Sequence, residues 1–226
     1  MEEQLKVIAR VRCAFPTKFG LPRQSGLVEA IRGTVVFEEE YRSPEALRGL
    51  EGFSHIWLLW GFHLAEKEGW SPTVRPPRLG GNTRMGVFAT RSPFRPNPIG
   101  LSCVRLEGIE EEKGLGMVLR VSGLDMTDGT PVYDIKPYLP HADCRPGATG
   151  GFAAAAAGYA LRVEDPEGLL EAAFPPAEAE AVRGALAQDP RPSYQRDPAR
   201  VYGFLFAGRD VRFCVEGDAL RVVEIR

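Results

Sequence analysis

One stretch of the chain gathers residues that could bind a polyanion. Between Trp70 and Leu101 it has six prolines and no acidic residue, and its arginines are Arg75, Arg78, Arg84, Arg91 and Arg95. Widening the stretch to residues 69–106 adds Arg105 and gives a formal charge of +6, which leaves −8 on the rest of a chain with a net charge of −2. Such a patch attracts phosphates and could bind a polyanion. Alternatively, the stretch is an edge segment whose arginines are only solvated.

The prolines of this stretch predict that it is rigid. Pro96 and Pro98 fix their own φ angles and push the residues before them, Arg95 and Asn97, toward extended geometry. A rigid amide and guanidinium groups in one segment are typical of a binding site. We therefore expect this stretch to hold a ligand.

Other residues that could do chemistry lie in expected strands. Asp134 and Lys136 share a face, so we expect them to pair, either for catalysis or only to balance a charge. His55 and His63 are separated by about 26 Å along a straight strand and therefore cannot ligate one metal. His63 ends its strand, where it either binds a ligand or serves as a hydrogen-bonded structural histidine.

Composition excludes several classes of protein. The chain has 226 residues, of which 44% are hydrophobic and 26% charged, as in soluble globular proteins. No apolar run approaches the roughly 18 residues of a membrane span, and the acidic N-terminus has no signal-peptide core, so we expect a cytoplasmic protein without a membrane partner. The four cysteines form no C-x-x-C pair, so neither a disulfide framework nor a metal site is expected. Nucleotide-binding and hydrolase signatures are absent from the sequence.

Short strands separated by turns must position these groups. Strands are expected at residues 4–13, 30–37, 53–64, 85–89, 101–109, 116–122 and 132–138, with a short helix at 43–50. The segment 53–64 is apolar at both parities, as in a strand buried on two sides or in a barrel wall. This pattern predicts a mainly β fold with a closed or nearly closed β-barrel.

The composition changes after Pro146, where a run of small residues suggests a linker. Residues 176–188 predict a helix with one apolar face, formed by Ala179, Val182, Ala185 and Leu186. Strands expected at 201–206, 211–215 and 219–225 suggest a small antiparallel sheet. We predict a β-barrel domain at 1–147 and a small α+β domain at 148–226, which contains a second rigid basic segment at 189–200.

Several long sequence segments together resemble one protein family. They are KFGLPRQSGL, RGLEGFSHIWLLWGFH, WSPTVRPPRLGGNTRMGVFATRSPFRPNPIGLS and LDMTDGTPVYDIKPYLP, and DPRPSY and YGF…DVRF extend the match into the second domain. The chain resembles the TsaA-like (YaeB, TrmO-type) tRNA methyltransferases. The resemblance implies a single-sheet β-barrel, a homodimer, that uses S-adenosylmethionine. It implies methylation of the exocyclic N6 of threonylcarbamoyl-adenosine at tRNA position 37, directly 3′ of the anticodon.

The resemblance also implies a cofactor pocket. Its expected residues are Ser25, Gly26, Leu27, His63, Leu64, Pro93, Cys103, Leu124, Asp125, Met126 and Thr127. Ser25 stands where the family usually has proline, and Pro93 and Cys103 fall at variable positions. Contacts made through the backbone should survive these differences.

The implied reaction suggests roles for individual side chains. The target nitrogen is ureido-like, so it needs a hydrogen-bond acceptor and a base. We expect Asn97 to hold the adenine edge, so that the Asn97→Ala variant loses turnover but keeps its affinity for the cofactor, and we expect Asp125 or Asp134 to accept the proton. The residues expected to bind tRNA are Arg75, Arg78, Arg91, Arg95, Arg191 and Tyr194, through phosphate or carboxylate contacts and stacking. No metal is expected.

Two alternatives remain open from sequence. A non-catalytic RNA-binding β-barrel would use the same basic patch but would not bind S-adenosylmethionine. A small-molecule methyltransferase of the same fold would show weak salt dependence, whereas a tRNA substrate demands a steep one.

Overall fold

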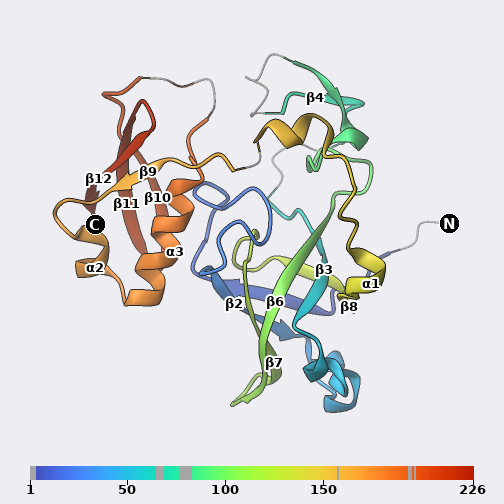
Figure 1. Cartoon of the computed structure of the whole chain (residues 1–226). Coiled ribbons are helices and arrows are strands. Elements are labelled where there is room, and N and C mark those ends of the chain that lie inside the picture. The colour runs from blue at the N-terminus through green and yellow to red at the C-terminus, as the bar shows by residue number, and fades with distance from the viewer. Residues whose placement is uncertain (1–3, 65–68, 77–82, 157, 193–194, 196) are drawn as a thin grey trace.

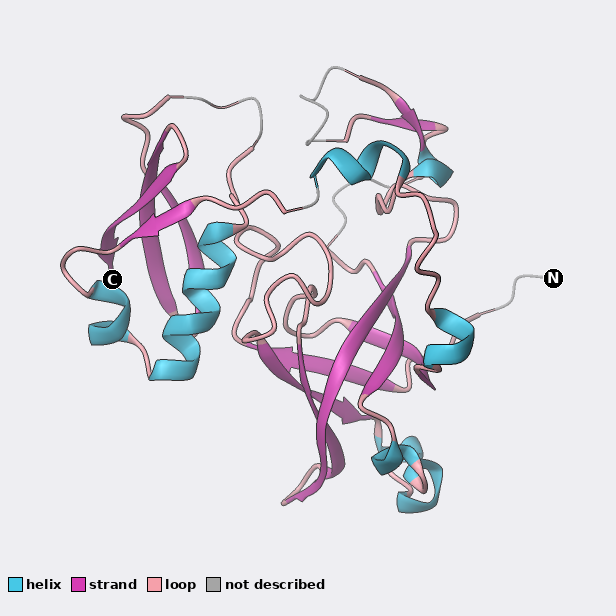
Figure 2. Cartoon of the chain, in the orientation of Figure 1, coloured by secondary structure: helices cyan, strands magenta, loops and turns pink. Residues whose placement is uncertain are grey.

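Six antiparallel strands close into a β-barrel in the N-terminal part of the computed structural model (Figures 1 and 2). The structure describes residues 4–64, 69–76, 83–156, 158–192, 195 and 197–226. Around the barrel the strands are β1 (Ala9–Cys13), β2 (Arg32–Phe37), β7 (Gly116–Ser122), β6 (Ile99–Glu112), β3 (His55–Gly61) and β8 (Pro131–Pro137). Strand β8 closes the barrel by pairing with β1, where Ala9 lies opposite Val132. The predicted mainly β fold is confirmed.

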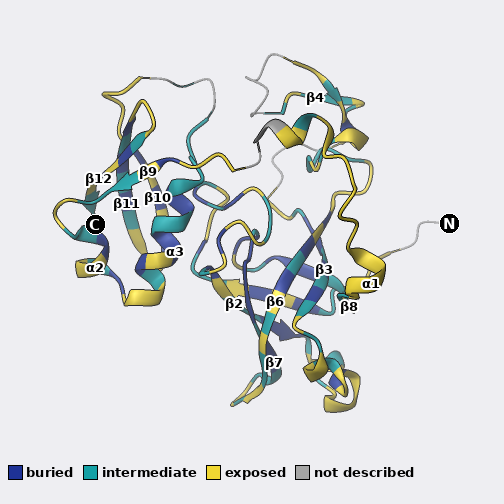
Figure 3. Ribbon diagram, viewed as in Figure 1, coloured by how far each residue is buried: buried dark blue, intermediate teal, exposed yellow. Residues whose placement is uncertain are grey.

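Alternating side chains of the strands build the barrel core. On β3, Ile56, Leu58 and Trp60 are buried, whereas Trp57 and Leu59 are only partly covered. Burial with a period of two is typical of a strand in a barrel wall, whose side chains point alternately inward and outward. The outward-facing residues of β3 are also apolar, because neighbouring groups partly cover them. Each fully buried aliphatic side chain contributes about 1.5–3 kcal/mol to folding. Figure 3 shows buried residues recurring along the barrel strands.

The C-terminal part forms a second, four-stranded sheet with two helices beside it (Figure 1). The sheet order is β10 (Tyr202–Phe206), β11 (Arg209–Glu216), β12 (Ala219–Ile225) and β9 (Arg162–Glu164), and the helices are α2 (Leu169–Ala173) and α3 (Pro176–Ala187). The predicted apolar face of the second helix is confirmed, because all four of its residues are buried. The three predicted strands pair antiparallel, as expected, and β9, which was not predicted, adds to β12 in parallel.

The two parts share one hydrophobic core. Phe15, from the loop after β1, lies with its ring centroid 4.9 Å from that of Phe206 and 6.0 Å from that of Phe204. The backbone N–H of Ala207 donates to the carbonyl of Ala14 at 2.9 Å. A Cβ added at Gly20 would lie 2.5 Å from the Phe204 ring, so only glycine lets this loop approach so closely. The loop after β1 therefore docks the C-terminal sheet onto the barrel.

A short arm projects from the barrel and carries much of the cationic segment (Figure 1). Its two strands, β4 (Thr73–Val74) and β5 (Met85–Gly86), pair antiparallel, and a 3-10 turn, η5 (Val87–Ala89), follows. The strand expected at 85–89 thus ends early.

Further short elements lie between the strands. They are the 3-10 turns η1 (Glu39–Tyr41), η2 (Pro44–Leu47), η3 (Leu50–Gly52) and η6 (Gly151–Ala156), and the short helix α1 (Pro140–Asp143). The helix expected at 43–50 is only the 3-10 turn η2, because Arg48 is extended and Gly49 is left-handed. Within the described ranges no helix combines the length and apolar character needed to cross a membrane.

Candidate functional site

An open cleft of about 1750 Å³ lies where barrel loops, the arm and the C-terminal part meet. The barrel contributes Trp60 on β3 and Asp125, in the loop after β7, to its lining. The C-terminal part contributes Phe152 and the segment 188–190. The cleft is therefore built by segments from both predicted domains. Its lining includes seven of the residues expected in the cofactor pocket, namely Leu27, His63, Leu64, Pro93, Asp125, Met126 and Thr127.

Asp125 is the acidic group of the cleft that the barrel holds most firmly. The hydroxyl of Ser102, a fully buried residue on β6, donates to Asp125 Oδ1 at 2.6 Å. The same hydroxyl oxygen accepts the indole N–H of Trp60 at 2.9 Å. Because Trp60 occupies the acceptor side of Ser102, the one hydroxyl proton is directed to the carboxylate. We refer to Trp60, Ser102 and Asp125 as the hydrogen-bond relay.

Burial raises the pKa of Asp125 above its ordinary value. The hydrogen bond from Ser102, backbone hydrogen bonds from Ser25 and from Asp125 itself, and the charge of Arg91 act in the opposite direction. A carboxylate in a poorly solvated site is a stronger base than one in water, and the donors around it act against this by favouring the ionised form. A buried, hydrogen-bonded carboxylate that lines a cleft is a candidate acid–base group.

The loop that holds Ser25, Gly26 and Leu27 lies against the segment after β7. The N–H of Gly26 donates to the carbonyl of Gly123 at 2.9 Å, and the Gly26 backbone has a φ of +75°. A Cβ added at Gly26 would meet nothing within 4 Å, so its backbone faces open space. Leu27 is 46% exposed, which leaves an aliphatic surface uncovered in the cleft.

His63 follows the end of β3 and contacts Thr130, which is hydrogen-bonded to Thr127. Its Nδ1 lies 3.5 Å from the hydroxyl oxygen of Thr130, a buried residue that donates to the carbonyl of Thr127 at 2.8 Å. Leu64 beside it is 42% exposed. The end of β3 thus presents a polar ring and an aliphatic side chain next to each other in the cleft.

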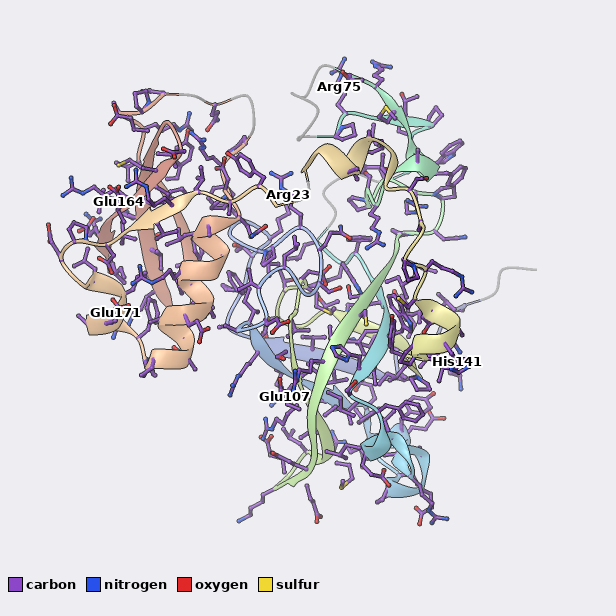
Figure 4. The ribbon with its side chains drawn as sticks, viewed as in Figure 1. Arg23, Arg75, Glu107, His141, Glu164 and Glu171 are labelled. Atoms are coloured by element: carbon purple, nitrogen blue, oxygen red, sulfur yellow. The ribbon has the colours of Figure 1, made fainter. Side chains whose placement is uncertain are left out.

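Basic side chains line the cleft from several segments. They are Lys18, Arg23, Arg75, Arg84 and Arg91. Figure 4 shows Arg23 between the barrel and the C-terminal sheet and Arg75 above it on the arm. Arg91 donates to the side-chain oxygen of Gln24, which ties the proline-rich segment to the loop after β1. Cations on both sides of one opening attract a polyanion.

Several residues expected in the site are placed elsewhere by the structure. Asn97 is exposed and does not belong to the described lining of the cleft. Asp134 on β8 forms the predicted ion pair with Lys136 at 2.8 Å, also apart from that lining. Cys103 pairs with Trp57 on the barrel wall, and burial raises the pKa of its thiol. Leu124 is buried in the core, where it anchors the loop that carries Asp125.

Only some of the expected tRNA-binding residues line the cleft. Arg75 and Arg91 line the cleft. Arg95 instead donates to the carbonyls of Thr90 and Val87, at 2.7 and 3.2 Å. Arg191 forms a bidentate ion pair with Asp189 at 2.8 and 3.1 Å, with only 14% of its side chain exposed. Arg78 and Tyr194 lie outside the described residues.

Sequence reasoning missed the residues that hold Asp125. Ser102 is a lone hydroxyl at an inward-facing position of β6, between Gly100 and Val104. A buried serine among apolar neighbours requires a partner, and that was the available signal. Trp60 was recognised only as part of an apolar strand. In the parts of the chain that the structure covers, no cluster of three or more His, Cys, Asp or Glu side chains is arranged to hold a metal ion.

Comparison with known proteins gives one consistent family. The models of the tRNA-methyltransferase O N-terminal domain and the TrmO C-terminal domain match residues 10–144 and 169–226. A tRNA (adenine(37)-N6)-methyltransferase of Escherichia coli K12 is 46% identical over 97% of this chain and 96% of its own. A Pseudomonas aeruginosa relative, provisionally named an S-adenosylmethionine-dependent methyltransferase, is 43% identical over 100% of this chain and 98% of its own. The crystal structure of TrmO from the same organism matches with a TM-score of 0.78, 38% identity and complete coverage of both chains.

Proposed function

The chain belongs to the tRNA-methyltransferase O family, and from this premise we propose that it methylates the exocyclic N6 of threonylcarbamoyl-adenosine at position 37 of tRNA. It is an S-adenosylmethionine-dependent tRNA methyltransferase, as its relatives of nearly full length indicate. The observation that carries the proposal is the cationic cleft around a buried, hydrogen-bonded carboxylate, Asp125. Phosphate attraction and an acid–base group in one opening suit nucleophilic attack by a nitrogen of RNA.

The residues of the cleft fit S-adenosylmethionine. Leu27 and Leu64 are 46% and 42% exposed and offer aliphatic surface to a flat base or a methylene chain. Gly26 does not line the cleft itself but precedes the lining residue Leu27 and has open space beside its backbone, and the negative charge of Asp125 would attract the positive sulfonium of the cofactor. We propose that residues 25–27, 63–64, Pro93 and 124–127 hold the cofactor, with Leu124 acting through its backbone and Cys103 as an outer-wall residue. When bound, the cofactor supplies an electrophilic methyl group on a sulfonium.

Asp125 is our proposed base. The lone pair of the ureido-type nitrogen is delocalised, so its attack is assisted by a group that accepts its proton. Asp125 lies in the cleft with its pKa raised by burial, and the relay fixes its orientation. Asp134 is paired with Lys136 away from the described lining, which makes it the weaker of the two predicted candidates.

Arginines of the cleft are proposed to hold the substrate. Arg91, fixed by Gln24, is suited to the threonyl carboxylate, because a guanidinium binds a carboxylate through two parallel hydrogen bonds. Arg75, on the arm, is suited to phosphates of the anticodon loop. Arg191 is already neutralised by Asp189, so we assign it a structural role first.

The proposed assembly is a cytoplasmic homodimer. Asn97 does not belong to the described lining of the cleft in one chain, so we propose that it holds the adenine edge from a second subunit. Sedimentation of wild type and the Asn97→Ala variant, together with their turnover, tests this. A monomeric wild-type enzyme with full activity contradicts the dimer, and wild-type turnover in the variant contradicts the role of Asn97.

The function is tested by a methylation assay on two preparations of one threonine tRNA, one carrying threonylcarbamoyl-adenosine and one unmodified. Both are digested to nucleosides for mass spectrometry after incubation with S-adenosylmethionine. A methyl group gained only by the carbamoylated nucleoside supports the proposal. Cofactor binding without methylation of either tRNA contradicts the substrate assignment, and failure to bind the cofactor contradicts the enzyme class.

A further inference from the structure

Two large aromatic side chains of the cleft are exposed. Phe88, in η5, is 73% exposed, and Trp70, at the base of the arm, is 54% exposed. The backbone N–H of Val87 donates to the carbonyl of Pro72 at 3.0 Å, so the turn that carries Phe88 is joined to the strand that follows Trp70. Exposed aromatic groups that line a cleft mark a surface that binds a flat or apolar partner.

Arg95 fixes the turn that carries Phe88. Its guanidinium donates to the carbonyl of Val87 on one side of Phe88 and to that of Thr90 on the other. Its Cζ also lies 5.7 Å from the centroid of the Phe88 ring, within the range of a cation–π contact. The ring is therefore held in place before any partner arrives, which lowers the entropic cost of binding. Arg95 is better explained as a support of this ring than as a phosphate contact.

The charge around these rings identifies the partner. Arg75, Arg84 and Arg91 line the same cleft, so a partner stacked on the rings would have cations along its edges. Single-stranded RNA combines flat bases with a negative backbone, and proteins bind it with aromatic faces among basic side chains. We propose that Phe88 and Trp70 form a stacking platform for nucleobases of the tRNA anticodon loop. The proposal rests on the proposed function and adds the residues that grip the unpaired bases.

The test measures equilibrium binding of an anticodon stem-loop RNA containing threonylcarbamoyl-adenosine over a series of salt concentrations. Phe88→Ala is expected to bind on the order of tenfold to a hundredfold more weakly at every salt concentration, with an unchanged salt slope. Phe88→Tyr is expected to restore binding because it keeps the aromatic face. Arg75→Ala is expected to weaken binding and to reduce the salt slope by roughly one. Leu205→Ala, which changes an exposed apolar residue on β10, is the control and should behave as wild type.

Three results would overturn the platform. The first is wild-type RNA affinity in Phe88→Ala. The second is a loss of S-adenosylmethionine affinity in that variant equal to its loss of RNA affinity, which would make the ring part of the cofactor site. The third is dissociation of an oligomer by the same substitution, seen by sedimentation, which would make it a contact with a second copy. Wild-type protein that binds no RNA would instead refute the proposed function, so the two failures are distinguishable.

Discussion

Replacing Ser102 by alanine should slow the enzyme selectively at low pH. The variant removes the 2.6 Å hydrogen bond to Asp125 and leaves the carboxylate in place. A hydrogen bond to a charged group contributes about 1.5–3 kcal/mol. That hydrogen bond lowers the pKa of Asp125, whereas burial raises it. Loss of the bond therefore disfavours the ionised form and raises the pKa further. At about 1.4 kcal/mol per factor of ten, the acid dissociation constant falls roughly tenfold to a hundredfold.

The sign of the pH effect follows from the role of a base. A proton acceptor works in its ionised form, so with Asp125 as the proposed base kcat/KM should fall as the pH drops through the pKa of this residue in the free enzyme. On that acidic limb kcat/KM is proportional to the dissociation constant, and the Ser102→Ala variant should be about tenfold to a hundredfold slower than wild type. At higher pH, where both enzymes are ionised, the two rates should converge. The assay is kcat/KM for tRNA methylation from acidic to alkaline pH.

Ser122 provides the matched control for this prediction. It is also a buried barrel serine, and its hydroxyl donates to a glutamate, Glu107, at 2.6 Å. Figure 4 shows Glu107 in the lower part of the barrel view, away from Arg23 at the cleft. The Ser122→Ala variant should lose stability but keep the wild-type pH profile. Equal profiles for Ser102→Ala and wild type, or the same displacement in both serine variants, would refute a specific action of the relay on Asp125.

Two further predictions concern the scaffold and the thiols. Gly20→Ala should lower the free energy of unfolding by about 1–2 kcal/mol for its φ of +97° and by about 1–3 kcal/mol more for the contact with Phe204. Gly49 has a φ of +89° and open space around it, so Gly49→Ala should lose only the roughly 1–2 kcal/mol that comes from the backbone conformation, measured by urea denaturation. Equal losses of stability in the two variants would contradict docking through the Gly20 loop. Cys144 is exposed, whereas burial raises the pKa of the Cys13 thiol to about 11, so iodoacetamide at mildly alkaline pH should modify Cys144 well before Cys13. Faster loss of Cys13, read by peptide mass spectrometry, would contradict the shielding of this partly buried thiol.

Much of the fold follows from local sequence patterns. The strands β7 and β12 have the predicted bounds because each is a short run of mostly apolar residues that follows a glycine-containing turn. Strand β9 was missed, since its three residues, Arg162–Glu164, have no pattern of their own and are ordered by pairing with β12. The helix expected at 43–50 failed because a left-handed Gly49 ends it after one turn.

The sequence predicted which segments contribute to the candidate site, but it did not predict the contacts between their side chains. Seven of the expected cofactor residues line one cleft. They could be named from sequence because long segments of the chain resemble one family. The contact between Ser102 and Asp125 joins residues of separate segments that only the closed barrel brings together. Arg95 looked like a phosphate ligand, and its hydrogen bonds to nearby carbonyls depend on a turn that no periodicity predicts.

The role of Asp125 is tested most directly by single-turnover methylation of the carbamoylated tRNA with two carboxylate variants. Asp125→Asn keeps an oxygen that can accept the Ser102 hydrogen bond but no longer accepts a proton from the substrate. At saturating concentrations of tRNA and S-adenosylmethionine it should react about 10²- to 10⁴-fold more slowly than wild type, so that a weaker cofactor affinity does not account for the loss. Asp134→Asn, which breaks only the exposed pair with Lys136, should react at the wild-type rate. A wild-type rate in Asp125→Asn, or a large loss in Asp134→Asn alone, would contradict the assignment of the base.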